Sequence, residues 1–170
     1  AVELPVTLKM RLGWDDENKN APSLAKIAED EGIKMITVHG RTRCQFYSGK
    51  ADWSFVKNVK DKINIPLVIN GDIKTIEDAV HALSQSGADG VMIGRGAYGK
   101  PWLINQVSHF LKSGEILPDP SPEIKLETIL SHYDEMLSYY GSHNGAMIAR
   151  KHLGWYSAGL DSSAEFRSKV

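Results

Sequence analysis

Four polar side chains that could bind a ligand follow runs of branched apolar residues. They are Lys9, His39, Asn70 and Arg95, each at the C-terminal end of a different run. Because the C-terminal ends of parallel strands meet at one edge of a sheet, we expect these groups to face a common ligand. An ammonium, an imidazole and an amide suit a flat heteroaromatic ring with carbonyl and nitrogen edges. His39 alone would more often be structural, so the prediction depends on all four together.

Glycines accompany two of these groups. The runs 66–73 and 90–96 each break from apolar residues into glycine and polar residues, and Thr75 can cap a helix between them. Glycine lets backbone N–H groups approach an anion, and the loops after the last strands of a barrel commonly hold phosphate. We therefore predict a phosphate site formed by amides near Gly94 and by the guanidinium of Arg95. The alternative is that the glycines serve only a tight turn.

The segment Gly94–Gly99 also matches the G-x-G-x-x-G pattern of dinucleotide-binding proteins. That fold needs a further strand ending in an acidic residue, whereas Asp119 falls in a proline-rich linker. A phosphate loop in a barrel is the better interpretation.

Composition excludes several kinds of site. The formal net charge is -1, so binding to a polyanion must come from local clusters. The histidines lack metal-ligand spacing, and we expect no metal. Cys44 is the single cysteine, lies beside Arg43, and has no assignable catalytic partner, so we interpret it as incidental. With no signal peptide and no long apolar run, we expect a cytoplasmic protein without a membrane partner.

The elements that must position these residues alternate between strands and helices. Strands are expected to start near residues 5, 34, 66 and 90, each followed by a helix. This spacing predicts an α/β fold with a parallel sheet and right-handed crossovers. Four such units form either a small doubly wound sheet or half of a (β/α)8 TIM barrel. The chain opens without methionine and enters a strand at once, which favours half a barrel cut from a longer protein.

The strand pattern does not return in the last third of the chain. A proline-rich linker, 118–122, leads into a helix that runs from Ser121 to Tyr140, and the segment Gly141–Gly145 is expected to break it before a further helix over 146–156. We therefore predict a half-barrel domain over residues 1–117 and a truncated helical domain over residues 118–170.

Cations and aromatic residues interleave in two segments. Arg41–Lys50 contains Phe46 and Tyr47, and Arg150–Tyr156 ends in Trp155 and Tyr156. Such patterns suit phosphates together with unstacked bases. The alternative is a solvated helix face with its aromatic residues in the core.

Five motifs taken together resemble the tRNA-dihydrouridine synthases. They are Pro5–Trp14, Val38–Arg43, Ile69–Ile73, Met92–Gly96 and Gly99–Trp102, and the segment Ala149–Tyr156 resembles the bacterial B-type branch. The resemblance implies an FMN-dependent oxidoreductase that reduces the C5–C6 double bond of particular uridines in tRNA, with NADPH as reductant. It also implies an N-terminal FMN-binding barrel and a C-terminal helical domain that helps to bind tRNA.

The resemblance also implies roles for individual residues. Lys9 and His39 would contact the flavin ring. The segment Asn70, Gly71 and Asp72 would line the ribityl and phosphate side, and Gly94 and Arg95 would hold the phosphate. The residues expected to face RNA are Arg11, Arg41, Arg43, Arg150 and Lys151.

One family feature is absent from this sequence. The catalytic cysteine of the family lies in an Asn-x-x-Cys-Pro segment of the first barrel half, and Cys44 stands in a different motif. We therefore expect strands five to eight of the barrel, no catalytic residue, and no turnover in isolation. The strand edges that a half-barrel exposes could support self-association. Two alternatives remain: a phosphate-binding barrel isomerase or lyase without flavin, and a non-catalytic RNA-binding fragment.

Overall fold

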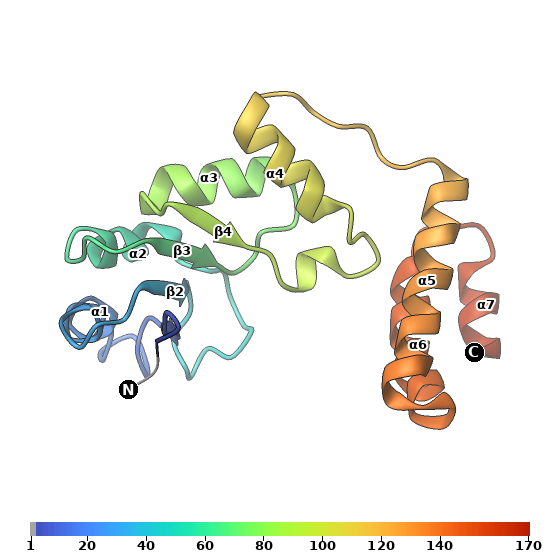
Figure 1. The fold of residues 1–170 in the computed structure, drawn as a ribbon, viewed down its shortest axis with the longest axis horizontal. Coiled ribbons are helices and arrows are strands. Elements are labelled where there is room, and N and C mark those ends of the chain that lie inside the picture. The colour runs from blue at the N-terminus through green and yellow to red at the C-terminus, as the bar shows by residue number, and fades with distance from the viewer. Residues whose placement is uncertain (1–2) are drawn as a thin grey trace. The chain divides into compact units, whose positions relative to one another are not determined.

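Four strands and three connecting helices form the first part of the chain in the computed structural model, which describes residues 3–170. The strands are β1 (Thr7–Arg11), β2 (Met35–His39), β3 (Leu67–Asn70) and β4 (Gly90–Met92). The helices are α1 (Ala21–Asp30), α2 (Trp53–Lys60) and α3 (Ile76–Ser86). All three strand pairs are parallel and follow the order β1-β2-β3-β4 (Figure 1).

The strand order decides between the two predicted architectures. Every crossover advances to the next strand in the same direction, and right-handed crossovers then place the connecting helices on one face of the sheet. A doubly wound sheet would need a reversal of strand order. The α/β fold and its interpretation as part of a TIM barrel are confirmed.

The two faces of the sheet differ in chemistry. The face toward the helices carries Ile36, Val38, Leu67 and Ile69, all completely buried. Alternate residues point the other way, and this second face carries Lys9, Thr37 and the end-of-strand residues. A core on one side and polar groups on the other are what a ligand-binding barrel interior requires.

Local caps fix where the helices begin. The Thr75 side chain accepts a hydrogen bond from Asp78 N–H at 3.1 Å, and the Asp78 carboxylate accepts one from Thr75 N–H, forming a capping box. Asp52 accepts a hydrogen bond from Phe55 N–H at 2.9 Å at the start of α2. The predicted capping role of Thr75 is confirmed.

Residues up to Gly96 and residues Ala97–Val170 form two compact units. A short 3₁₀ helix, η1 (Arg95–Ala97), spans the boundary between these units. The second unit contains α4 (Leu103–Ser113), α5 (Pro122–Tyr140), α6 (Ser142–Tyr156) and α7 (Ser163–Lys169). The predicted domain division at residues 117 and 118 stays a prediction. Within residues 3–170, every helix is too short or too polar to cross a membrane.

The break between α5 and α6 is shorter than predicted. Gly141 alone interrupts the helices, with a φ of 78°, and α6 begins at Ser142 rather than at Ala146. Gly145 therefore lies inside α6, where a Cβ atom would stand 2.6 Å from the Met136 carbonyl oxygen of α5. This glycine permits a close crossing of two helices, so its interpretation as a helix breaker was wrong.

Candidate functional site

Three of the predicted ligand-binding groups, Lys9, His39 and Asn70, lie on the polar face of the sheet. His39 and Asn70 end β2 and β3 and pair in register, and Arg11 pairs with His39 at the end of β1. Lys9 lies two residues before Arg11 in β1 and pairs with Thr37. The prediction that Lys9 ends its strand was therefore wrong by two residues. Arg95 follows β4 in η1.

His39 is an uncharged imidazole at neutral pH. Its side chain is 7% exposed, and burial, together with the nearby cations Arg11, Lys9 and Arg41, lowers the pKa of His39 to about 4. A neutral imidazole donates one hydrogen bond and accepts another, which suits a ligand edge with both kinds of group.

Lys9 supplies a cation two residues before the end of β1. Its side chain is exposed as a whole, but partial desolvation of the amine and the Arg11 guanidinium lower the pKa of Lys9. An anion bound beside the amine would favour its charged form.

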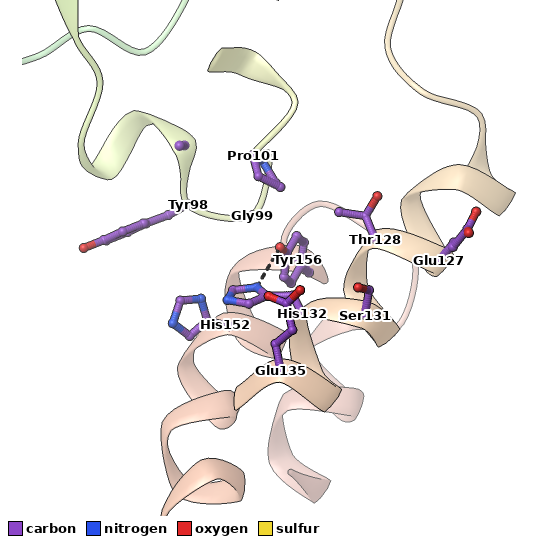
Figure 2. A pocket seen from close by; sticks show the side chains of 11 residues that line it. Tyr98, Gly99, Pro101, Glu127, Thr128, Ser131, His132, Glu135, His152 and Tyr156 are labelled. Atoms are coloured by element: carbon purple, nitrogen blue, oxygen red, sulfur yellow. Dashed lines mark hydrogen bonds between the residues drawn. The ribbon is translucent and has the colours of Figure 1, made fainter. Parts of the chain in front are cut away.

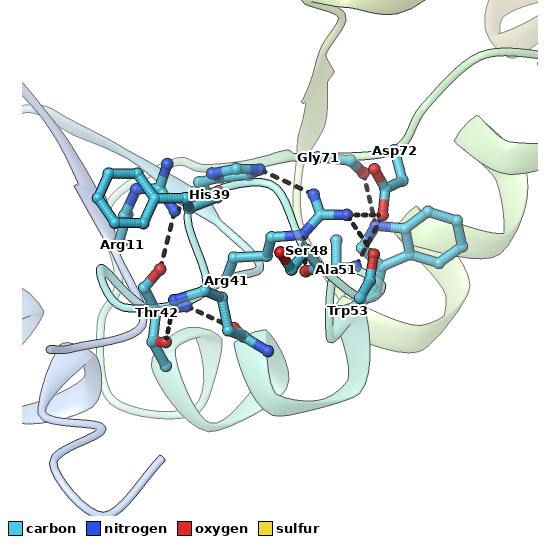
Figure 3. Close-up of polar contacts among 12 residues, drawn as sticks. Arg11, His39, Arg41, Thr42, Ser48, Ala51, Trp53, Gly71 and Asp72 are labelled. Atoms are coloured by element: carbon cyan, nitrogen blue, oxygen red, sulfur yellow. Dashed lines mark hydrogen bonds and ion pairs between the residues drawn. The ribbon is translucent and has the colours of Figure 1, made fainter. Parts of the chain in front are cut away.

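Arg41 is buried. Figure 3 shows the hydrogen bonds and the ion pair that its guanidinium makes. Its guanidinium donates to Ser48 O at 3.0 Å, to Gly49 O at 2.7 Å, and to Asp72 Oδ2 at 2.7 Å. The same Asp72 oxygen accepts a hydrogen bond from Ala51 N–H at 2.8 Å. These five residues, called here the Arg41 cluster, join the end of β3 to the loop after β2. Arg41 is 2% exposed, and its RNA contact stays a prediction that this arrangement does not favour.

Backbone conformation at Gly71 and Asp72 builds the cluster. Gly71 has a φ of 117°, and a Cβ atom there would lie 2.6 Å from Cδ2 of His39. Asp72 adopts a φ of 57°, a left-handed conformation uncommon outside glycine. Burial alone would raise the pKa of Asp72, but hydrogen bonds from Ala51 N–H and from Arg41 lower it. The carboxylate therefore serves the cluster, and its predicted ligand contact stays a prediction.

Tyr47 gathers two of the predicted cations around one exposed ring. Cζ of Arg95 lies 4.2 Å from the ring centroid and Cζ of Arg11 lies 5.9 Å from it, while the tyrosine is 61% exposed. Arg43 lies over Phe46 in the same loop, with Cζ at 4.2 Å from the ring centroid. The sequence pattern indicates both aromatic residues but not the pairing of Tyr47 with Arg95, because 48 positions separate these two residues in the chain.

The two glycines beside Arg95 have different surroundings. A Cβ atom at Gly96 would lie 2.1 Å from the Ile73 carbonyl oxygen, so Gly96 is required by packing. At Gly94 a Cβ atom would meet nothing within 4 Å. The space beside Gly94 leaves room for an anion next to the exposed Arg95 guanidinium, and the phosphate site there stays a prediction.

In the helical unit, Arg150 and Lys151 are exposed on α6. The neighbouring aromatic residues are partly packed: Trp155 stacks on Tyr98 with ring centroids 4.0 Å apart, and the Tyr156 hydroxyl lies 3.1 Å from Nδ1 of His132. The alternative of packed aromatic residues therefore applies in part, and RNA contact by Arg150 and Lys151 stays a prediction. Across residues 3–170, no group of three or more His, Cys, Asp or Glu side chains could hold a metal ion.

Fold and site together define part of a (β/α) barrel with a polar, cation-bearing edge at the C-terminal ends of its strands. The sequence model of the dihydrouridine synthase (Dus) family matches residues 1–170. The chain therefore belongs to the dihydrouridine synthase family, as its motifs indicated.

Two curated relatives illustrate the match. A probable tRNA-dihydrouridine synthase of Rickettsia bellii is 63% identical over 170 residues, which cover 100% of this chain and 52% of the relative. The tRNA-dihydrouridine synthase B of Xanthomonas axonopodis pv. citri is 48% identical over 170 residues, covering 100% and 51% respectively. The chain thus spans about half the length of the curated relatives it matches.

Among solved structures, the wild-type GGGPS of Thermoplasma volcanium aligns with a TM-score of 0.41 at 23% identity. The alignment covers 58% of this chain and 39% of that one. A likeness at this level carries no argument about function.

Proposed function

We propose that this chain forms part of a tRNA-dihydrouridine synthase that reduces the C5–C6 double bond of uridines in tRNA. Family membership and the names of the curated relatives support this function. The proposal includes FMN as cofactor, NADPH as reductant, tRNA as partner and the cytoplasm as location. It also keeps the division into a half-barrel over residues 1–117 and a helical domain over residues 118–170.

The observation that carries the FMN proposal is that the sheet combines polar side chains on one face with free space beside an arginine. Lys9, His39 and Asn70 stand on one face of the sheet, and Gly94 leaves free space next to Arg95. A heteroaromatic ring and a phosphate on one ligand would use both features. When bound, FMN would carry a hydride from NADPH to the uracil ring, and a proton would complete the saturated C5–C6 bond.

Each residue then has a distinct task. The Lys9 ammonium stabilises negative charge on the ligand ring, and His39, neutral at pH 7, donates or accepts a hydrogen bond at the ring edge. The Asn70 amide is oriented because its Nδ2 donates to Met92 O at 2.8 Å. Arg95 and the amides near Gly94 hold the phosphate. No proton donor is assigned within this chain, and Cys44, exposed in the loop after β2, is not proposed as one.

The test is the visible spectrum of the purified protein after mixing with FMN and desalting. We expect retained flavin absorbance, with FMN affinity reduced about 10- to 100-fold by Arg95→Ala, the loss expected for hydrogen bonds to a charged group. Gly94→Ala should also weaken FMN binding without affecting folding, because its Cβ meets no atom of the chain. Lys62→Ala, an exposed lysine away from the sheet edge, is the control.

Absence of retained flavin from well-folded wild-type protein would overturn the FMN proposal. If the same sample bound inorganic phosphate at Arg95, the isomerase or lyase alternative would replace it. Formation of dihydrouridine in tRNA in the presence of NADPH, measured by mass spectrometry as the addition of two hydrogen atoms to uridine, then tests the reaction itself in a protein that also contains the first barrel half.

A further inference from the structure

A pocket of about 580 Å³ lies within the helical unit, formed by α5, α6 and the segment 97–101 (Figure 2). The α5 wall carries Glu127, His132 and Glu135, and the α6 wall carries His152 and Tyr156. This volume is in the range of small-ligand sites. The pocket belongs to a different unit from the sheet edge described above, and neither the polar side chains of the sheet nor Arg95 lines it.

Aromatic rings give the pocket a fixed shape. His132 and His152 meet edge to face with ring centroids 4.7 Å apart, and Figure 2 shows the contact between His132 Nδ1 and the Tyr156 hydroxyl. The Trp155 ring meets the His152 ring edge to face, with ring centroids 5.0 Å apart. A Cβ atom at Gly99 would lie 2.4 Å from the Trp155 carbonyl oxygen, so glycine allows the segment 97–101 to lie directly on α6.

The charge of the pocket disfavours an anion. None of its lining residues is lysine or arginine, whereas Glu127 and Glu135 contribute carboxylates. Burial, together with His132, lowers the pKa of His152, which keeps this ring neutral at physiological pH. The exposed cations of α6, Arg150 and Lys151, do not line the pocket. A ligand that enters should therefore be planar and uncharged and should offer N–H donors to the carboxylates, while any phosphates it carries stay outside.

We infer that this pocket receives an unpaired nucleobase with an exocyclic amino group, such as cytosine, adenine or guanine, from the tRNA. The base packs against the imidazole and phenol rings, and its amino group donates to Glu135 or Glu127. Uracil lacks an exocyclic amino group, so this base is distinct from the uridine that is reduced. The inference rests on the proposed function in taking tRNA as the partner.

Two neighbouring residues of α5 provide a matched pair of variants. Glu135 lines the pocket, whereas Asp134 is exposed and does not. Removing a negative charge should slightly tighten RNA binding wherever the charge acts only through its field. We expect Asp134→Asn to follow that rule and Glu135→Gln to weaken binding of an unmodified tRNA transcript about 5- to 10-fold, because a charged hydrogen-bond acceptor is lost. Tighter binding by both variants would overturn the inference.

Base preference is tested separately with mononucleotides. Imidazole NMR signals of His132 and His152 should shift on titration with CMP, AMP or GMP, and should shift at least 10-fold less at the same concentration of UMP. Equal shifts with UMP, or no shift with any nucleotide, would overturn the inference. The variant His152→Phe keeps a ring but loses both nitrogens. If its His132 signal shifts less with CMP while the protein stays folded, the shifts report the pocket rather than unfolding.

FMN retention measured on the same samples separates this inference from the proposed function. If wild-type and Glu135→Gln proteins both retain FMN but bind tRNA equally well, only the pocket inference is wrong. If the wild-type protein shifts the histidine signals with CMP but retains no FMN, the pocket inference holds and the FMN proposal is wrong.

Discussion

His39 combines a buried position with three neighbouring cations, and this combination determines its charge. The pKa of His39 in the folded protein is about 4, whereas the ordinary value is 6.5. Between these two pH values the unfolded chain binds a proton that the folded chain does not. The free energy of unfolding therefore decreases as pH falls through this window, and the decrease is complete below pH 4.

This linkage gives a prediction for His39→Gln. From pH 7 to pH 4 the wild-type protein should lose on the order of 3 kcal/mol more stability than the variant, since each pKa unit corresponds to about 1.4 kcal/mol. Urea unfolding at several pH values measures both proteins, and taking their difference removes the contribution of the carboxylates. Parallel pH profiles for the two proteins would contradict the prediction.

The Arg41 cluster predicts that charge alone cannot replace arginine. In Arg41→Lys, one ammonium cannot reproduce the geometry of three hydrogen bonds to Ser48, Gly49 and Asp72, and the partly buried Asp72 carboxylate loses part of its compensation. We expect a loss of about 1–3 kcal/mol in the free energy of unfolding, the cost of leaving hydrogen-bond acceptors without their donors. Chemical denaturation measures it, with the exposed Arg43→Lys as control. A loss equal to that of the control would show that the cluster contributes little.

At the scale of elements, α6 contains two glycines in opposite surroundings. Gly145 is in close contact with the α5 backbone, whereas a Cβ atom at Gly154 would meet only the flexible Arg167 side chain, at 3.6 Å. We expect Gly145→Ala to destabilise the helical unit by about 1–3 kcal/mol through overpacking. Gly154→Ala should stabilise it by about 0.5–1 kcal/mol through helix propensity. Thermal unfolding followed by circular dichroism compares them, and effects of the same sign would contradict this account.

Elements whose signals are local were predictable from sequence. Thr75 and Asp52 act on the first turn of their own helices, so their side-chain types are sufficient to place those helices. Gly145 was misinterpreted because its reason lies on another helix, and sequence spacing does not show how closely two helices approach. The engagement of Arg41 was missed for the same cause: its partner Asp72 stands 31 positions away.

The site shows the same division. The apolar runs predicted the strand ends that carry His39 and Asn70. The predicted position of Lys9 was wrong by two residues along its strand. The stacking of Arg95 on Tyr47 and the pocket between α5 and α6 had no sequence signal beyond residue type, because both depend on how separate elements pack.

At the scale of the whole molecule, the formal net charge of -1 means that RNA attraction must come from local cations. Arg150→Ala and Lys151→Ala should each weaken tRNA binding and reduce the slope of log K against log salt by about 0.7–0.9. The exposed Lys62→Ala should leave the slope unchanged. Filter binding across a salt series measures the slopes, and slopes identical to wild type for both α6 variants would remove these residues from the RNA-contacting surface.

The in-order sheet has a consequence for how the chain is made. Each strand pairs with the strand preceding it in the chain, so every ladder is complete once the newest unit has left the ribosome. The four strands β1–β4 can therefore be added one after another during synthesis, with each finished edge serving as template for the next unit, and none of the three ladders between them waits for a distant partner. Such growth shortens the time for which the edges of β2 and β3 stay unpaired, when they could pair with neighbouring nascent chains.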